Sequence, residues 1–311
     1  MATLTPAQVA LHTNEAQLAK QRYILSRTPV RDASDWHGAL RLSRQLIADA
    51  LRASTFLTDI PAALRASGTH MLVFRHIMAP PTSQDQFALM CPTWRKSTER
   101  PPDAGRTRRP MPVLQAQNAA AVFLARRSQS LTPWLDAGRR PFPRELRRLL
   151  WSVAPSIANQ QFVTLQRGKA AVAQEGAVIS MLQRKGWIRR PGSLLDTRAE
   201  LPLRHFMHKT RYATAAATPQ EVDIAMGLRN TVVLAMECKV SNDQTNSVKR
   251  VNDILKKATA WKTHWGSFVK TAALLQGVIA PKDVIRLHEA EVEVFWSHDL
   301  TAFEAWIDSQ T

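Results

Sequence analysis

The sequence predicts an α/β (α+β) protein in which a helical N-terminal region is followed by a mixed central sheet flanked by helices. Three observations lead to this prediction. The first 160 residues place apolar side chains mostly at helical spacing. Residues 161–311 alternate short β-rich runs with helical patterns, an order typical of a sheet with helices on its faces. The 311 residues are 45% hydrophobic, which is enough for one large core or two smaller ones.

The N-terminal region is expected to contain helices over residues 6–25, 36–53, 116–128 and 143–165. Between the second and third lies Thr93–Pro112, which is rich in Pro and Arg and lacks apolar periodicity, and therefore predicts an exposed loop. We expect Arg106, Arg108 and Arg109 in this loop to contact a phosphate backbone. A solvated linker that carries incidental charge is the alternative.

The C-terminal region is expected to begin with a helix over 161–184, which Gly186 ends. Strands over 221–226 and 231–240 come next, and the second is apolar on both faces, as a central strand is. A helix over 246–268, a strand over 272–279, a helix over 281–289, a strand over 291–296 and a helix over 300–308 complete the region. The apolar stripe of the 246–268 helix is Val248, Val251, Leu255, Ala258, Trp261, Trp265 and Phe268.

The charge of the chain favours a nucleic acid as partner. The formal net charge is +17 and the pI is about 10.8, and such a field attracts polyanions. Thirteen Lys or Arg and only four Asp or Glu lie from Arg95 to Arg148, so more than half of the surplus is concentrated there. A ribosomal or nucleoid structural protein would share this charge.

Other classes of protein are disfavoured by composition. The longest apolar run, Ala119–Ala125, is far shorter than the roughly 20 residues of a membrane span. The N-terminus lacks the basic start and apolar core of a signal peptide. Cys91 and Cys238 give neither a zinc spacing nor a disulfide framework. A cytoplasmic protein without membrane contact is expected.

The strand pattern around EVDIAMGLRNTVVLAMECK predicts a metal site. Side chains alternate across a strand, so Glu237 and Lys239 share one face and Cys238 points to the other. A hairpin would bring Asp223 beside Glu237, and a divalent cation relieves the repulsion between two carboxylates. Mg²⁺ prefers such oxygen ligands, and the backbone carbonyl of Cys238 is a further candidate ligand. With a cation to activate water and Lys239 to stabilise developing charge, hydrolysis of a phosphodiester is expected.

Glu175 is a fourth candidate member of this site. It lies three residues after Val172 and four before Ile179, on the stripe expected to face the core. A carboxylate there is costly unless it is paired or bound to metal, and a structural partner for an Arg is the alternative. Glu221 shares a strand face with Asp223 but has no assigned role.

These residues resemble the PD-(D/E)XK nuclease superfamily, in particular type II restriction endonucleases of the XamI-like kind. The resemblance covers about residues 160–311 and rests on Glu175, on Asp223 in EVD, on MECKVS with Glu237 and Lys239, and on NSVKRVNDILKKATAW. One departure is that no Pro directly precedes Asp223.

The resemblance implies a PD-(D/E)XK nuclease core over 161–311 and Mg²⁺-dependent cleavage of double-stranded DNA at a short, palindromic site. Asp223 and Glu237 would be ligands, Lys239 would lie beside the attacking water, and Glu175 would support them. It also implies a homodimer and a companion DNA methyltransferase, with the Arg-rich residues 1–160 serving DNA binding and dimerisation.

Base recognition is expected from Asn242, Asn246, Lys249 and Arg250, because Asn and Arg can read base edges in the major groove. An N-cap at Asn246 with solvated charges beyond it is the alternative. Two other functions stay open, namely a nuclease of the same superfamily directed by DNA structure or modified bases, and a non-catalytic basic DNA-binding protein.

Overall fold

The computed structural model describes residues 4–100, 110–216 and 218–311 and divides the chain into two compact units. One unit, called here the sheet unit, contains Met1–Thr28 and Gln166–Thr311, and the other, the helical unit, contains Pro29–Leu165. The predicted mixed α/β class is confirmed. The units differ from the predicted regions 1–160 and 161–311 in that the first helix belongs with the sheet. The assignment of DNA binding and dimerisation to residues 1–160 stays a prediction.

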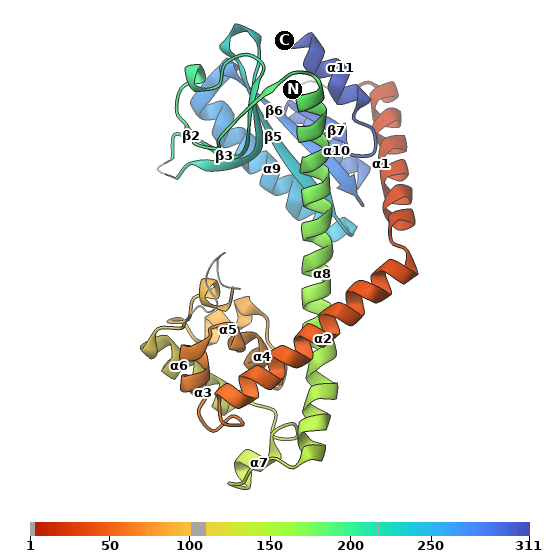
Figure 1. Ribbon diagram of the computed structural model, residues 1–311. Helices are drawn as coiled ribbons and strands as arrows, with labels where there is room; N and C mark the ends of the chain where they lie inside the picture. Colours follow the sequence, from red (N-terminus) through yellow and green to blue (C-terminus); the bar gives the residue numbers. More distant parts are fainter. Residues whose placement is uncertain (1–3, 101–109, 217) are drawn as a thin grey trace. The chain divides into compact units, whose positions relative to one another are not determined.

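The elements succeed one another along the chain as Figure 1 shows. The helices of four or more residues are α1 (Pro6–Ser26), α2 (Pro29–Ala53), α3 (Ile60–Ala66), α4 (His70–Ile77), α5 (Gln84–Met90), η1 (Lys96–Glu99), α6 (Val113–Arg126), α7 (Pro133–Asp136), α8 (Pro143–Arg184), α9 (Gln244–Trp265), α10 (Pro281–Glu289) and α11 (Thr301–Ser309). The strands are β1 (Ile188–Arg190), β2 (Leu194–Leu195), β3 (His205–Tyr212), β4 (Gln220–Gly227), β5 (Val233–Ser241), β6 (Val269–Gly277) and β7 (Val292–Trp296).

The sheet is mixed, and its strand order is β1-β3-β4-β5-β6-β7 with β2 also paired to β3. Strands β3, β4 and β5 form an antiparallel meander. Strands β5, β6 and β7 run parallel, as helix crossovers between them require. Lys239 is the one residue of β5 that is not buried, so β5 is the central strand that its apolar sequence predicts.

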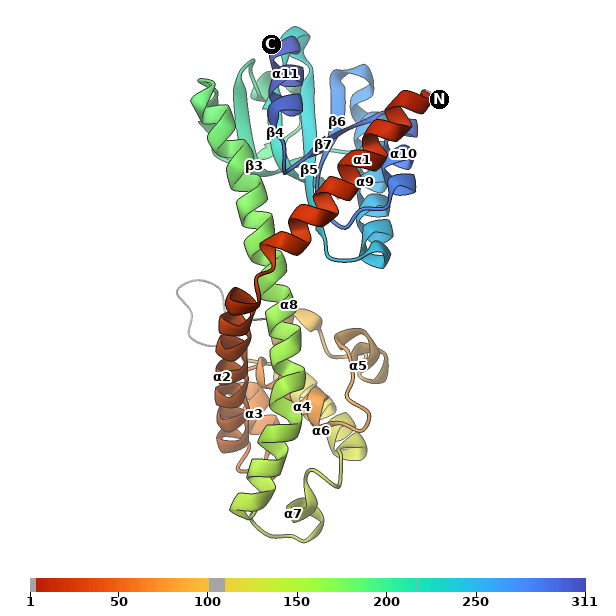
Figure 2. The same ribbon diagram turned by 90° about the vertical axis from the view of Figure 1, so that its right-hand side faces the viewer.

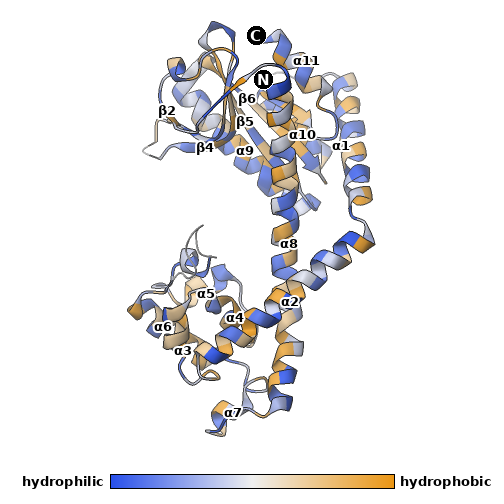
Figure 3. Ribbon diagram, viewed as in Figure 1, coloured by the Kyte–Doolittle hydropathy of each residue, from blue (hydrophilic) through white to orange (hydrophobic). Residues whose placement is uncertain are grey.

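Helices cover both faces of the sheet. Val178 of α8 and Phe303 of α11 pack on the face that carries Met236 and Leu274. Helices α9, α10 and α1 cover the opposite face, and Figure 2 shows these three helices gathered on one side of β6 and β7. The colouring of Figure 3 shows apolar residues in the sheet unit and also in helices α3, α4 and α6 of the helical unit. The end of β5 is therefore held between helices, and it is the place where the charged residues of the predicted site lie.

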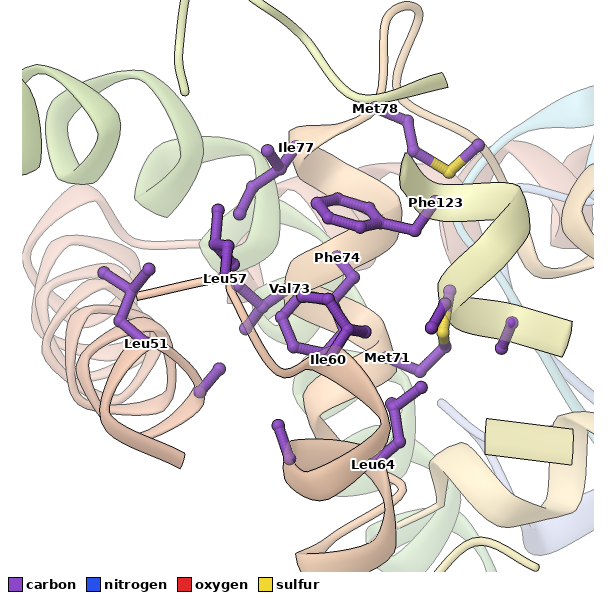
Figure 4. Close-up of a cluster of buried hydrophobic side chains, with 14 of the residues drawn as sticks. Leu51, Leu57, Ile60, Leu64, Met71, Val73, Phe74, Ile77, Met78 and Phe123 are labelled. Carbon is purple, nitrogen blue, oxygen red and sulfur yellow. The ribbon is translucent and has the colours of Figure 1, made fainter. Parts of the chain in front are cut away.

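The helical unit has a core of its own, part of which Figure 4 shows around Phe74 and Phe123. A buried ion pair lies beside it, because Arg75 Nε donates to Glu99 Oε2 over 2.8 Å and both side chains are almost fully buried. Trp94 is also buried and packs edge-on against Phe87, with ring centroids 5.1 Å apart. Trp94, which lies at the start of the Arg-rich segment, is therefore a core residue. Among the described residues, none of the helices has the length and apolar character to cross a membrane.

The predicted helices and strands form with four differences. The patterns over 143–165 and 161–184 merge into the single helix α8, which ends before Gly186 in the left-handed conformation, φ 78°. Helix α9 ends at Trp265, so Phe268 lies outside it and is exposed. Its N-cap is Asp243 rather than Asn246, because the Asp243 side chain accepts the backbone N–H of Asn246 over 2.7 Å. Strands β1, β2 and β3, which lack clear alternation of apolar residues, were not predicted.

Candidate active site

The hairpin of β4 and β5 brings Asp223 and Glu237 together. The paired residues run outward to Ile224 and Met236, so Asp223 and Glu237 are the next positions on the two strands. The backbone N–H of Cys238 donates to Asp223 Oδ2 over 2.8 Å. The Cys238 side chain packs with Met236 in the core on the other face, and burial raises the pKa of its thiol well above the ordinary value. The structure thus places these side chains as strand alternation predicts.

Glu237 is fully buried and is held by two ammonium groups. Lys239 Nζ lies 2.5 Å from Glu237 Oε2, and Lys257 Nζ of α9 lies 3.0 and 2.9 Å from the two carboxylate oxygens. Lys257 also donates to the backbone carbonyl of Glu221 over 2.9 Å. Burial raises the pKa of Glu237 above its ordinary value, although Lys239 and Lys257 oppose the rise. The charge of this buried carboxylate is thus neutralised by two lysines of the chain.

Asp223 is in the opposite electrostatic situation. Burial alone would raise its pKa, but Lys239, Lys209 and the Cys238 amide together outweigh burial and lower the pKa of Asp223. Lys209 Nζ lies 2.6 Å from Asp223 Oδ1, and Lys239 Nζ lies 3.6 Å from Asp223 Oδ2. The same two carboxylates raise the pKa of Lys239 against the effect of its burial. The surroundings therefore move the pKa values of the two neighbouring carboxylates in opposite directions, as often occurs in active sites.

Glu175 faces this cluster from α8 and is buried, as predicted. Its partners are not an Arg: His208 Nε2 donates to Glu175 Oε2 over 2.7 Å and Lys209 Nζ to Glu175 Oε1 over 2.6 Å. The predicted apolar stripe was partly wrong, because Val172 is 71% exposed while Leu182 is buried.

Gln174, the residue before Glu175, fixes α8 to the sheet. Its side-chain amide donates to the Leu274 carbonyl of β6 over 2.9 Å and to Ser297 Oγ, just after β7, over 2.6 Å. The Gln174 side chain is buried, so these hydrogen bonds form away from water, where they are strongest. The hydrogen bonds of Gln174 therefore fix the position of α8 on the sheet, and with it the position of the neighbouring residue Glu175.

Lys209 has an unusual backbone conformation for a strand residue. Its φ is 55°, in the left-handed region that bulky residues rarely adopt. Successive residues of a regular strand point to opposite faces, yet His208 and Lys209 both reach Glu175. The β3–β4 pairing is interrupted at Lys209 and resumes in the same register at Thr210 and Val222. The left-handed turn of the backbone thus allows two neighbouring residues to serve one carboxylate.

The donor set fits a hard divalent cation. Asp223 and Glu237 offer carboxylate oxygens only, and Mg²⁺ commonly uses one or two carboxylates and keeps several waters. Within residues 4–100, 110–216 and 218–311, no three His, Cys, Asp or Glu side chains are grouped so that they could hold a metal ion together. A site built on two carboxylates, a backbone carbonyl and water is therefore the form in which a metal would fit.

The remaining predicted residues lie apart from this cluster or outside the described part of the chain. Asn242, Asn246, Lys249 and Arg250 lie at and after the end of β5, in the first turns of α9. Their role in base recognition stays a prediction. Arg106, Arg108 and Arg109 lie outside the described residues.

A shallow depression of about 320 Å³ adjoins His208, and it is lined by Arg189, Arg190, Pro191, Gly192 and His208. Two guanidinium groups thus lie at the surface beside the candidate site. Sequence reasoning did not single out these residues, because strand β1, which carries them, was not predicted.

Three further residues of the cluster were missed from the sequence. Lys209 and His208 lie on the unpredicted strand β3. Lys257 lies off the apolar stripe of α9 and was given no role. One signal was present: Lys257 comes one helical turn after Asp253, and Asp253 Oδ2 lies 3.6 Å from Lys239 Nζ. Helical spacing could therefore have placed Lys257 near the end of β5 once α9 was packed on that strand.

Comparisons with known proteins agree with this arrangement. A model of the XamI restriction endonuclease family matches residues 55–296, a range that contains the three carboxylates and the one lysine predicted as catalytic, Glu175, Asp223, Glu237 and Lys239. The type II restriction enzyme XamI of Xanthomonas campestris pv. amaranthicola is 29% identical over 136 residues. These residues are 43% of this chain and 48% of that enzyme, so the match spans about half of the relative.

Among solved structures, the crystal structure of protein VC1899 from Vibrio cholerae aligns with 91% of this chain and 58% of its own, at 10% identity and a TM-score of 0.31. A likeness of that size supports no argument about fold or function.

Proposed function

The chain belongs to the XamI restriction endonuclease family, and we propose that it is a type II restriction endonuclease that hydrolyses phosphodiester bonds of double-stranded DNA at a short specific site. The observation that carries the proposal is the convergence of Asp223, Glu237 and Lys239 at the end of β5, with Glu175 contributed by α8. Burying carboxylates and lysines together is costly in desolvation, and phosphodiester hydrolysis uses groups of both kinds.

In this proposal Mg²⁺ is the cofactor, held by Asp223, Glu237 and the Cys238 carbonyl. When bound, such an ion supplies Lewis-acid polarisation of a phosphate oxygen and makes water a better nucleophile. Lys239 keeps its proton, since nearby carboxylates raise its pKa, and it orients the attacking water and stabilises the negative charge that develops on phosphorus oxygens. Glu175 orients Lys209 and His208 at the edge of the site.

Several groups are proposed to hold the DNA. Arg189 and Arg190 beside His208 are placed to bind a phosphate next to the scissile one. Asn242, Asn246, Lys249 and Arg250 are proposed to read bases, and Arg106, Arg108 and Arg109 to contact the backbone more broadly. A homodimer on a palindromic site, with a cognate DNA methyltransferase as genetic partner, completes the proposal, because two-fold protein symmetry matches two-fold DNA symmetry.

The test is cleavage of plasmid DNA in Mg²⁺ by the wild type and Lys239→Ala, with Lys282→Ala as the matched control. Lys282 is an exposed lysine of α10. We expect discrete fragments from the wild type and Lys282→Ala, and cleavage reduced by at least about 100-fold in Lys239→Ala.

Two other outcomes would favour the alternative functions. A smear of fragments would indicate a nuclease that lacks sequence specificity. No cleavage of any substrate together with retained DNA binding would indicate a non-catalytic DNA-binding protein. Replacing Mg²⁺ by EDTA should stop cleavage, and cleavage that continues in EDTA would contradict the metal assignment.

A further inference from the structure

We propose that Lys209 is a built-in counter-cation of the metal-free site, whose ammonium holds Glu175 and Asp223 together until a divalent cation displaces it. This inference rests on the proposed function, because it assumes that Asp223 is a metal ligand. It gives Lys209 a positioning role and makes metal binding a competition between an ion from solution and a cation carried by the chain itself.

The contacts of Lys209 are those of a bridging cation. Its Nζ lies 2.6 Å from an oxygen of Glu175 and 2.6 Å from an oxygen of Asp223. The two carboxylates come from different elements, α8 and β4, and both are largely buried, with side chains 9% and 15% exposed. Without a cation between them they would repel each other in a medium that screens poorly. In the metal-free protein the ammonium thus offsets the repulsion between the two carboxylates, as a bound metal ion would.

The charges of the three largely buried carboxylates Glu175, Asp223 and Glu237 are balanced by three ammonium groups with Lys209 in place. Glu175, Asp223 and Glu237 supply three negative charges when ionised, and Lys209, Lys239 and Lys257 supply three positive ones. A divalent cation added to these three pairs would meet little net attraction, since the further carboxylate, Asp253, lies at the rim, 3.6 Å from Lys239 Nζ and about half exposed. Once Lys209 moves away, the carboxylates are left with one excess negative charge and with free oxygens, so metal entry and Lys209 departure are linked.

Lys209 is the lysine best able to leave. Its side chain is 54% exposed, whereas those of Lys239 and Lys257 are 13% and 15% exposed. Its ammonium can exchange the two carboxylates for water by rotation about side-chain bonds, at modest cost in solvation. Lys257, in contrast, is also held by the Glu221 carbonyl.

The backbone around Lys209 is shaped to bring the side chain to this position. A φ of 55° is strained for a bulky residue, and such strain persists where the surrounding structure imposes it. Gly192 contributes to this, because a Cβ on Gly192 would lie 2.8 Å from the Lys209 carbonyl oxygen and 3.1 Å from that of His208. A residue without a side chain therefore admits the turned backbone. The left-handed backbone of Lys209 and the glycine at position 192 that faces it are therefore two independent features that position the bridging ammonium.

The experiment measures binding of Mn²⁺ to the full chain by calorimetric titration in the absence of DNA. The variant is Lys209→Met, which keeps the length of the side chain and removes its charge. Arg211→Met is the matched control, since it removes one positive charge from an exposed residue of the same strand. We expect Lys209→Met to bind Mn²⁺ at least about tenfold more tightly than the wild type, and Arg211→Met to bind like the wild type.

Two further measurements distinguish a counter-cation from a purely structural lysine. They are Mn²⁺ binding by Lys209→Arg and thermal unfolding with and without Mn²⁺. Lys209→Arg keeps the charge and should bind Mn²⁺ as weakly as the wild type. In EDTA, Lys209→Met should unfold at a lower temperature than Arg211→Met, and Mn²⁺ should restore more of its stability than it gives to the wild type.

Failure of this inference is distinguishable from failure of the proposed function. Equal Mn²⁺ affinity of the wild type and Lys209→Met, with binding lost in Asp223→Asn, would overturn the role of Lys209 and leave the metal site intact. Affinity raised equally in Lys209→Met and Arg211→Met would also overturn it, since general charge would then be the cause. No Mn²⁺ binding by any variant would overturn both.

Discussion

Replacing Lys257 by Met should destabilise the metal-free protein by an amount that depends strongly on pH. The substitution removes the ammonium that contacts both oxygens of Glu237, a side chain with no exposed surface. Glu237 then keeps only Lys239 as a close cation. Truncating one partner of a buried ion pair costs about 3–5 kcal/mol when the remaining charge cannot escape.

Glu237 can lose its charge by taking up a proton, and the free energy of that protonation limits how much stability Lys257→Met can lose. A Glu with an ordinary pKa of about 4.3 is neutralised at pH 7 for about 4 kcal/mol and at pH 5 for about 1 kcal/mol. The electrostatic loss of folding free energy in Lys257→Met cannot exceed these costs of protonation. Since Lys239 remains, we expect a loss of about 2–4 kcal/mol at pH 7 and about 1 kcal/mol at pH 5.

The sign is set by proton linkage. The folded pKa of Glu237 already lies above its ordinary value, so above about pH 4 the folded state binds more protons than the unfolded state. This group's contribution to stability therefore falls as pH rises through the folded pKa. Lys257→Met raises that pKa further, so the fall should be larger and should extend to higher pH than in the wild type.

The assay is urea denaturation in EDTA at pH 5 and pH 7, monitored by tryptophan fluorescence. Lys256→Met is the control, because Lys256 is the neighbouring, exposed lysine of α9 and its loss should change stability by less than about 0.5 kcal/mol. A loss in Lys257→Met that is the same at both pH values, or that matches the control at pH 7, would refute the reasoning.

Three further predictions concern other parts of the chain. Arg75→Met should lower the free energy of unfolding of the helical unit by about 3–5 kcal/mol, because Glu99 is left buried and unpaired; a thermal unfolding curve like that of the wild type would contradict the buried pair. Gly192→Ala should destabilise the protein by about 1–3 kcal/mol, since its Cβ would lie 2.8 Å from the Lys209 carbonyl oxygen. The control Gly168→Ala, whose Cβ meets nothing within 4 Å, should not destabilise the protein in the same denaturation assay. DNA binding should weaken by at least about tenfold between roughly 50 and 200 mM salt, because lysines and arginines that contact phosphates release counterions; an affinity independent of salt in a fluorescence-anisotropy titration would contradict a role for the net charge of +17.

The part of the candidate site that could be predicted is the part built on regular structure. Glu237 and Lys239 lie on a strand whose apolar residues are unmistakable, and strand alternation alone puts them on one face. The short connection between β4 and β5 then sets Asp223 opposite Glu237. Glu175 was found by helical periodicity, although that periodicity also placed the exposed Val172 in the core.

The part that could not be predicted depends on departures from regular structure. Strand β3 carries charged residues on the exposed side and a left-handed Lys209 in its middle, so period-two alternation is absent from its sequence. Lys257 was missed for a different reason. Its position on α9 is off the apolar stripe, but a lysine side chain is long enough to carry its charge back to the sheet. Periodicity locates a backbone face and does not say where the end of a long side chain lies.

The hydrogen bonds of Gln174 limit how the α8 segment can change its length. Each residue inserted into a helix moves the residues beyond it by 1.5 Å and turns them by about 100°. An insertion between Gln174 and Leu182 would force a choice between the amide bonds of Gln174 to the sheet and the burial of Val178 and Leu182. Either choice displaces Glu175 or opens the core. The seven residues between Gln174 and Leu182 should therefore tolerate substitutions at exposed positions but neither insertions nor deletions.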